Sequence, residues 1–189
     1  VDTLLDSAGN NALDFRENND GVKLDTSATR NFSVDTLRTV NRVAESTAGY
    51  FTTIYGTSFD DTIRASGNVG ARIFAGDGIN TIVGTDGDDY IEGGDSVDTI
   101  DGRAGNDILI GGGASDLLSG GSGDDLLVGN GGADSLDGGT DNDRLWGGNR
   151  PNDSLVLPSS SDADLADQLT GGKGDDALVG GVGNDTLQG

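Results

Sequence analysis

The sequence predicts an all-β protein, a right-handed parallel β-roll (a β-solenoid) of 18-residue coils with an irregular β cap at its N-terminal end. Three observations lead to this prediction. The chain is rich in Gly and Asp, a nine-residue period runs through its second half, and each period carries one Ile or Leu at a fixed place.

Composition excludes several classes of function. The 189 residues include 34 Gly, and 33 acidic against 11 basic residues give a formal net charge of −22. Because Cys and His are absent, thiol nucleophiles, Ser-His-Asp triads, zinc sites of the His or Cys type and disulfides are excluded. The negative charge argues against nucleic acids and anionic membranes as partners, and no apolar run is long enough for membrane insertion. The chain begins Val1-Asp2-Thr3 without a signal peptide, as expected for a segment of a larger protein.

The period is clearest between Gly84 and Trp146, where seven consecutive blocks begin with Gly. The eighth residue of every block is Ile or Leu, and the sixth is Asp: Asp89, Asp98, Asp107, Asp116, Asp125, Asp134 and Asp143. Upstream, Asn80 takes the sixth position. Downstream, we expect Asp153 to take it after one extra residue, then Asp167, Asp176 and Asp185 after an irregular insertion at about 156–166.

Each block is interpreted as a six-residue turn followed by a three-residue strand. A helix is excluded because repeated Gly costs about 1 kcal/mol each relative to Ala. In a strand of three residues, the middle one points inward, so the eighth-position Ile and Leu form a thin core. One block makes half a coil, and the strands stack into two parallel sheets.

Two blocks, GGSGDDLLV and GGKGDDALV, match the repeat G-G-x-G-x-D-x-U-x at every fixed position. The sequence therefore resembles the RTX (haemolysin-type) calcium-binding nonapeptide repeat family. The resemblance is strong over 84–146 and 171–189, weaker over 56–83 and 147–170, and poor over 1–55. It implies Ca²⁺ ions that each bridge turns two repeats apart, through Asp side chains and turn carbonyls. It also implies type I secretion, in which the chain crosses the membranes unfolded and folds outside the cell.

Stacked turns also predict cation binding on physical grounds. One turn column is expected to carry Asp89, Asp107, Asp125 and Asp143, and the other Asn80, Asp98, Asp116, Asp134 and Asp153. Like charges this close repel unless a cation neutralises them, and Ca²⁺ prefers six to eight oxygen ligands, whereas Mg²⁺ requires a tighter octahedron. We expect about five to eight Ca²⁺ ions. The predicted ligands are these residues with Asp167, Asp176 and Asp185, and turn glycines: Gly84, Gly87, Gly102, Gly105, Gly120, Gly121, Gly123, Gly171, Gly172, Gly174 and Gly183.

Three features are expected to weaken the sites. Asn80 lacks a carboxylate charge. Ser96, Ala114 and Asp141 replace the fourth-position Gly and are expected to tilt their turns. The insertion is expected to interrupt both columns, and either loops out or donates Asp162 or Asp164.

The outer faces of the two sheets differ. One carries Tyr90, Ile108, Ile110, Leu126, Val128 and Trp146, so we expect it to be covered by the N-terminal segment, the insertion, or a protein or glycan partner. The alternative is a scatter of outward apolar residues.

Two domains are predicted: residues 1–55 as an irregular β cap and 56–189 as the roll. Strand-like runs at 12–15, 22–24, 32–40 and 50–55 support the first, and an independent small β unit is the alternative.

The leading functional interpretation is a non-enzymatic, calcium-dependent structural and secretion module. It would belong to an extracellular bacterial protein, such as an adhesin, a surface-layer protein or the tail of a secreted hydrolase, and would contact adjacent domains of the parent chain. One alternative is a Ca²⁺-dependent polysaccharide lyase, which needs a basic residue beside the ligands; Arg64, Arg72 and Arg103 are the candidates. The other is a module that binds a glycan or protein through the apolar face.

Overall fold

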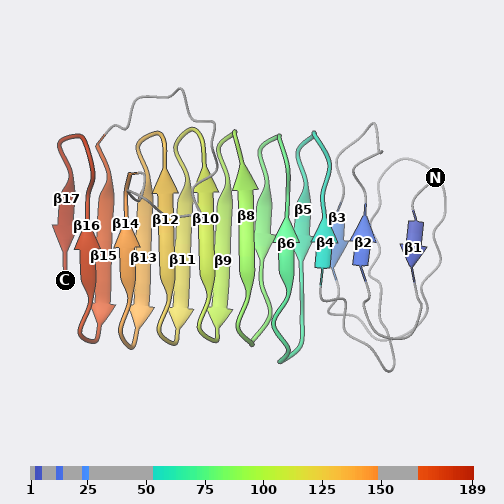
Figure 1. Ribbon diagram of the computed structural model, residues 1–189, viewed down its shortest axis with the longest axis horizontal. Helices are drawn as coiled ribbons and strands as arrows, with labels where there is room; N and C mark the ends of the chain where they lie inside the picture. The colour runs from blue at the N-terminus through green and yellow to red at the C-terminus, as the bar shows by residue number, and fades with distance from the viewer. Residues whose placement is uncertain (1–2, 6–11, 15–22, 26–52, 149–165) are drawn as a thin grey trace.

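The computed structural model describes residues 53–148 and 166–189, together with the backbone of β1 (Thr3–Leu5), β2 (Ala12–Asp14) and β3 (Lys23–Asp25). All regular structure in these ranges is β-strand, and the strands form two sheets, as Figure 1 shows. No helix in the described part of the chain could cross a membrane.

The first sheet has nine strands in the order β1-β2-β4-β6-β8-β10-β12-β14-β16. Its members in the roll are β4 (Thr53–Tyr55), β6 (Arg72–Phe74), β8 (Tyr90–Gly94), β10 (Ile108–Gly112), β12 (Leu126–Asn130), β14 (Arg144–Trp146) and β16 (Ala177–Val179). The second has eight, from β3 to β17: β5 (Thr62–Arg64), β7 (Thr81–Val83), β9 (Thr99–Ala104), β11 (Leu117–Ser122), β13 (Ser135–Thr140), β15 (Gln168–Lys173) and β17 (Thr186–Gln188).

The register confirms the predicted coil. Leu109 pairs with Leu127 in the first sheet, and Leu118 pairs with Leu136 in the second. Both pairs are parallel and lie 18 residues apart, so one block contributes a strand to one sheet and the next block contributes to the other. The chain is therefore a parallel β-solenoid.

The core is the predicted inward column. Ile82, Ile91, Ile100, Leu109, Leu118, Leu127, Leu136 and Leu145 are each at most 1% exposed. With Ile54, Ile63, Ile73 and Leu169 they belong to one cluster between the two sheets. Each coil contributes two large apolar side chains, so the core is continuous along the roll but thin.

Strands of the N-terminal segment pair with the same two sheets. β2 pairs in parallel with β4, and β3 pairs in parallel with β5, whereas β1 pairs with β2 in the antiparallel sense. The strand-like run at 32–40 lies outside the described residues.

The insertion does not interrupt the sheets or the turn columns, so that expectation was wrong. Leu136 pairs with Leu169, and Leu145 pairs with Leu178, although 33 residues separate each pair. The backbone N–H groups of Gly147 and Gly148 donate to the carbonyls of Val179 and Gly180 in the next coil, and the backbone N–H of Asp134 donates to Oδ1 of Asp167. Asp167 therefore occupies the place in the column predicted for Asp153. Asp153, Asp162 and Asp164 themselves lie outside the described residues.

The outer face of the first sheet is covered in part. Ile110 is 0% and Val128 is 2% exposed, although neither belongs to the core cluster, and Trp146 is half-buried. Leu117, on the outer face of the second sheet, is 50% exposed. Ile110 and Val128 are thus buried, as the predicted covering requires, and which segment or partner covers this face stays a prediction.

Candidate metal-binding turns

The sixth-position aspartates point into the turns, and those from Asp61 to Asp167 that the structure describes are buried, whereas Asp176 and Asp185 are half-buried. Oδ1 of each accepts a hydrogen bond from the backbone N–H of the sixth-position residue one coil earlier; for example, Asp107 N–H donates to Asp125 Oδ1 at 2.8 Å. These bonds form two unbroken columns. One runs from Ala71 through Asp89, Asp107, Asp125 and Asp143 to Asp176, and the other from Asp61 through Asn80, Asp98, Asp116, Asp134 and Asp167 to Asp185.

The second carboxylate oxygen, Oδ2, differs from Oδ1 in its hydrogen bonding. In seven consecutive turns, Oδ2 is buried and has no hydrogen-bond partner in the chain: Asp98, Asp107, Asp116, Asp125, Asp134, Asp143 and Asp167. A buried oxygen without a donor is costly, and more so when it is charged. Each of these turns therefore has an acceptor that the protein leaves unsatisfied.

The first-position Gly brings this oxygen close to a carbonyl. A Cβ placed on Gly120 would lie 2.2 Å from Asp125 Oδ2 and 2.7 Å from the carbonyl oxygen of Gly138 in the next coil. The same two kinds of oxygen surround Gly93, Gly102, Gly129 and Gly147. Only Gly fits here, and its missing side chain leaves a small cradle lined by a carboxylate and a carbonyl.

The turn that ends at Asn80 shows which backbone groups face the side chain of the sixth-position residue. Its Nδ2 donates to the carbonyls of Gly76 (3.2 Å) and Gly78 (3.0 Å). Gly76 and Gly78 have φ of 92° and 95°, and the equivalent Gly121 and Gly123 have φ of 114° and 120°. An Asp in a turn of this backbone shape presents an oxygen to the carbonyls to which Asn80 presents an N–H. Carboxylate and carbonyl oxygens without donors are the ligand set that Ca²⁺ prefers.

Burial acts on the same carboxyls. Desolvation raises the pKa of Asp98 and Asp125 to about 7, that of Asp107 to about 8 and that of Asp116 to about 9. Backbone hydrogen bonds oppose the shift in each case, and neighbouring aspartates add to it for Asp107, Asp116 and Asp125. A nearby cation would favour the ionised form that burial disfavours.

Backbone carbonyls must supply much of any coordination shell. Among the residues that the structure describes, no group of three or more Asp or Glu side chains could hold a metal ion together. The residues present fit Ca²⁺, which accepts carbonyl oxygens freely, better than a cation that needs many carboxylates.

The predicted glycines have different roles. Gly84, Gly102, Gly120 and Gly171 hold the first position against the Asp carboxylate. Gly105, Gly121, Gly123, Gly172, Gly174 and Gly183 adopt positive φ, and Gly87 does not. Ala114 (66°) and Asp141 (83°) adopt positive φ like the Gly they replace, so their turns keep the common shape instead of tilting.

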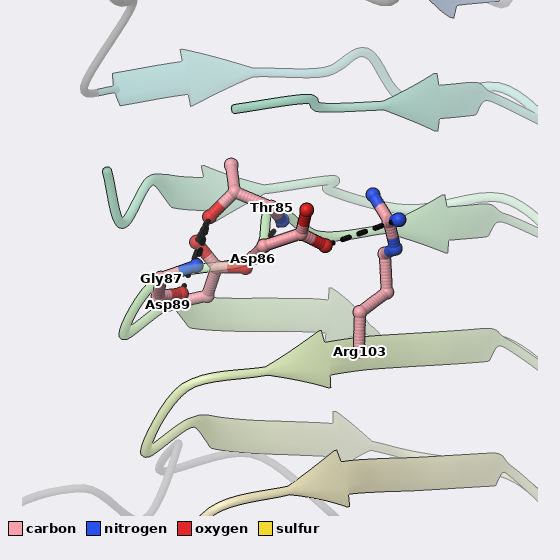
Figure 2. Close-up of polar contacts among 5 residues, drawn as sticks. All are labelled: Thr85, Asp86, Gly87, Asp89 and Arg103. Atoms are coloured by element: carbon pink, nitrogen blue, oxygen red, sulfur yellow. Dashed lines mark hydrogen bonds and ion pairs between the residues drawn. The ribbon is translucent and has the colours of Figure 1, made fainter. Parts of the chain in front are cut away.

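Sequence reasoning missed the residues other than Gly at the second position. Arg103 and Asn130 take positive φ there, at 83° and 72°. Thr85 instead donates its backbone N–H to Asp89 Oδ2 (2.6 Å) and its hydroxyl to Asp89 Oδ1 (2.8 Å), as Figure 2 shows. Thr57 bonds to Asp61 in the same way. The sequence feature that could have revealed these turns is Gly-Thr in place of Gly-Gly.

Comparison with known proteins agrees with this geometry. The family model of the RTX calcium-binding nonapeptide repeat (4 copies) matches residues 48–68, 74–109, 92–127, 110–145 and 164–189, more than half of the chain. No curated protein matches it. The matched repeats coincide with the stacked turns and their unsatisfied carboxylates, and the chain belongs to the RTX calcium-binding nonapeptide repeat family.

Proposed function

We propose that the chain is a calcium-driven structural module in which the turns with unsatisfied carboxylates hold the ions. The observation that carries this proposal is the set of seven buried Oδ2 atoms without donors, one in each turn from Asp98 to Asp167. Asp176 and Asp185 continue the columns and are proposed as outer ligands.

Within a turn, Asp Oδ2 and the backbone carbonyls around it are the proposed ligands. When bound, Ca²⁺ supplies the positive charge that these oxygens lack. Oδ1 remains engaged with the preceding coil through the backbone N–H, so one carboxylate both stacks the coils and closes its turn. This double use explains why Asp recurs at the sixth position, where a longer Glu side chain would not keep the same short reach.

Folding and binding are expected to be coupled. Each nine-residue repeat buries one large apolar side chain, while ordering its backbone costs about 1–2 kcal/mol per residue. The thin core does not offset this cost in the repeats whose carboxylates are also unsatisfied. Without the cation we expect these repeats to unfold, as in other proteins where metal binding provides the folding energy.

This coupling suits a chain that is exported unfolded and folds outside the cell. Low cytosolic calcium would keep the repeats unfolded. The extracellular calcium concentration would be high enough to occupy sites with a Kd of about 10⁻⁴–10⁻³ M, and the repeats would then fold. We infer an extracellular, non-enzymatic role in a larger bacterial protein, such as an adhesin, a surface-layer protein or a secreted hydrolase. Family membership supports the calcium step, and type I secretion is part of the proposal.

Two of the three arginines that the lyase alternative would use are engaged in other contacts. Arg103 forms an ion pair with Asp86 at 3.0 Å, and the Arg72 guanidinium lies 5.1 Å from the centre of the Tyr90 ring. Both are engaged in contacts between coils.

Far-UV circular dichroism during a Ca²⁺ titration tests the proposal, with Mg²⁺ as the control cation. We expect β-structure to increase sharply with Ca²⁺ and little with Mg²⁺. A complete β spectrum in calcium-depleted buffer, unchanged by Ca²⁺, would refute calcium-driven folding.

A further inference from the structure

The turn from Gly84 to Asp89 satisfies its carboxylate with the chain's own donors. Asp89 Oδ2 accepts from Thr85 N–H, and Oδ1 accepts from the Thr85 hydroxyl and from Ala71 N–H at 2.6 Å. The Thr85 oxygen also accepts a bond from Gly87 N–H at 3.1 Å. Figure 2 shows the contacts among Thr85, Gly87 and Asp89, and beside them the ion pair that joins Asp86 to Arg103 of the next coil. Both oxygens of this buried carboxylate therefore have partners.

The turn from Gly56 to Asp61 repeats the arrangement. Thr57 N–H donates to Asp61 Oδ2 at 2.7 Å, its hydroxyl lies 3.1 Å from Oδ1, and the hydroxyl oxygen accepts from Phe59 N–H. Thr57 and Thr85 are buried and do not have the positive φ found at the second position of later turns, at Gly94, Arg103, Gly112, Gly121, Asn130 and Gly139. A Thr at this position thus goes with a different turn backbone.

The two remaining turns before Gly93 also need no cation. In the turn that ends at Asn80, the amide Nδ2 donates to two turn carbonyls and Oδ1 accepts from Asp61 N–H. In the other column, Ala71 takes the place of the Asp and brings no carboxylate. The unsatisfied carboxylates begin with Asp98, in the next turn along the chain.

The same coils carry side-chain contacts that do not depend on a cation. The rings of Tyr55 and Phe74 stack with centroids 5.2 Å apart, and the Phe74 and Tyr90 rings lie 5.8 Å apart. Arg72 lies over Tyr90. Inside, Ile54, Ile63, Ile73, Ile82 and Ile91 are fully buried, with Ala65, Ala71 and Ala75 between them.

We propose that residues 53–92 form a cation-independent template, and that Thr57, Asn80 and Thr85 close their turns to cations. The repeats from Gly93 onward stack on this template when calcium binds. The template presents two fixed donors to them, since Asn80 N–H bonds to Asp98 Oδ1 (2.8 Å) and Asp89 N–H bonds to Asp107 Oδ1 (2.7 Å). Folding then proceeds from the N-terminal coils toward the C-terminal ones. The calcium-dependent stacking of the later repeats rests on the proposed function, whereas the cation-independent template does not.

Hydrogen exchange of the full 189-residue chain, read by mass spectrometry of peptides, tests the template. In calcium-depleted buffer we expect peptides within 53–92 to exchange at least about tenfold more slowly than unstructured peptides, and those within 98–145 to exchange freely. Calcium should protect the latter. Free exchange throughout 53–92 without calcium would overturn the proposal, as would equal protection of both regions.

Two variants test the individual turns, with bound calcium per chain measured by equilibrium dialysis. Asn80→Asp keeps the Gly76 and Gly78 backbone but removes the amide donor, so we expect one additional bound ion and weaker protection of the template without calcium. Thr85→Val removes only the hydroxyl, so we expect an unchanged ion count and loss of protection around Asp89. Thr140→Val, in a turn of the cation-binding type, is the matched control and should change neither readout.

The outcomes separate the two proposals. If Asn80→Asp binds no more calcium than the natural chain, Asn80 does not close its turn and the inference fails while calcium binding stands. If the natural chain binds no calcium but 53–92 stays protected, the proposed function fails and the template stands.

Discussion

The backbone N–H of Asp107 donates a hydrogen bond of 2.8 Å to Oδ1 of Asp125, which lies one coil further along the same turn column. The other oxygen of the same carboxylate, Oδ2, is buried without a donor. One side chain therefore carries two functions: its first oxygen fixes the stacking of coils, and its second is available to a cation. Substitutions at Asp125 can separate coil stacking from cation binding.

Asp125→Ala should impair both functions. The Asp107 N–H loses its acceptor inside the roll, which costs about 1–3 kcal/mol, and the turn loses its cation ligand. We expect a lower ion count and a higher calcium midpoint in circular dichroism. Asp137→Ala removes the same charge from an exposed strand position and serves as the control. Equal midpoints for the two variants would contradict the assigned stacking.

Asp125→Asn should preserve coil stacking and remove the cation ligand. The amide oxygen can still accept from Asp107 N–H, and the amide nitrogen can donate to turn carbonyls as Asn80 does. We expect one fewer bound ion but higher stability than Asp125→Ala in calcium-depleted buffer, by about 1 kcal/mol in urea unfolding. If the Asn variant is no more stable than the Ala variant, the carbonyls do not face the side chain.

Gly120→Ala tests the first-position cradle. The added Cβ would meet Asp125 Oδ2 at 2.2 Å and must displace it, at a cost of about 1–3 kcal/mol. We expect weaker calcium binding, measured as a shifted midpoint. Gly113→Ala is the matched control, because a Cβ there meets nothing closer than 3.0 Å and Gly113 does not have positive φ. A calcium midpoint no higher in Gly120→Ala than in Gly113→Ala would argue against the cradle.

The pH dependence of the fold should reverse with calcium. Burial raises the pKa of Asp98, Asp107, Asp116 and Asp125 from 3.8 to about 7, 8, 9 and 7, so the cation-free fold binds more protons than the unfolded chain. Its stability is then highest below pH 3.8 and is lost as pH rises through these folded values. With calcium bound, the ionised form is needed, so acid should weaken the fold.

Circular dichroism between about pH 5.5 and pH 9 measures this dependence. In calcium-depleted buffer we expect more β-structure at the acidic end, and with calcium in excess we expect more at the basic end. An increase of β-structure with pH in the depleted buffer would contradict the raised pKa values.

Much of the fold could be predicted because the nine-residue period acts at every level. Gly at the first position, Asp at the sixth and Ile or Leu at the eighth together determine turn, column and core, and the pairing of Leu109 with Leu127 follows directly. The positions of the buried aspartates could be predicted equally well, because they occupy the same place in each repeat.

The rest depended on information that a period does not contain. The register across the insertion could not be inferred, because Asp153 and Asp167 both fit the column by spacing and only the pairing of Leu136 with Leu169 selects Asp167. Some turns satisfy their sixth-position side chain with the chain's own groups, and others leave a carboxylate oxygen without a donor. The difference depends on where single donor groups point, such as Thr85 N–H and Asn80 Nδ2. Both residues look like minor departures from a consensus, yet each changes what its turn can bind.

The unbroken pairing of strands on either side of the insertion has a practical consequence. The strands on either side remain in register although paired residues there lie 33 residues apart, against 18 elsewhere. The fold therefore accepts additional residues between Gly148 and Ala166 without a shift of the strands on either side. This part of the sequence is a natural position for grafting a foreign peptide or an affinity tag, whose display the proposed calcium-driven folding would control.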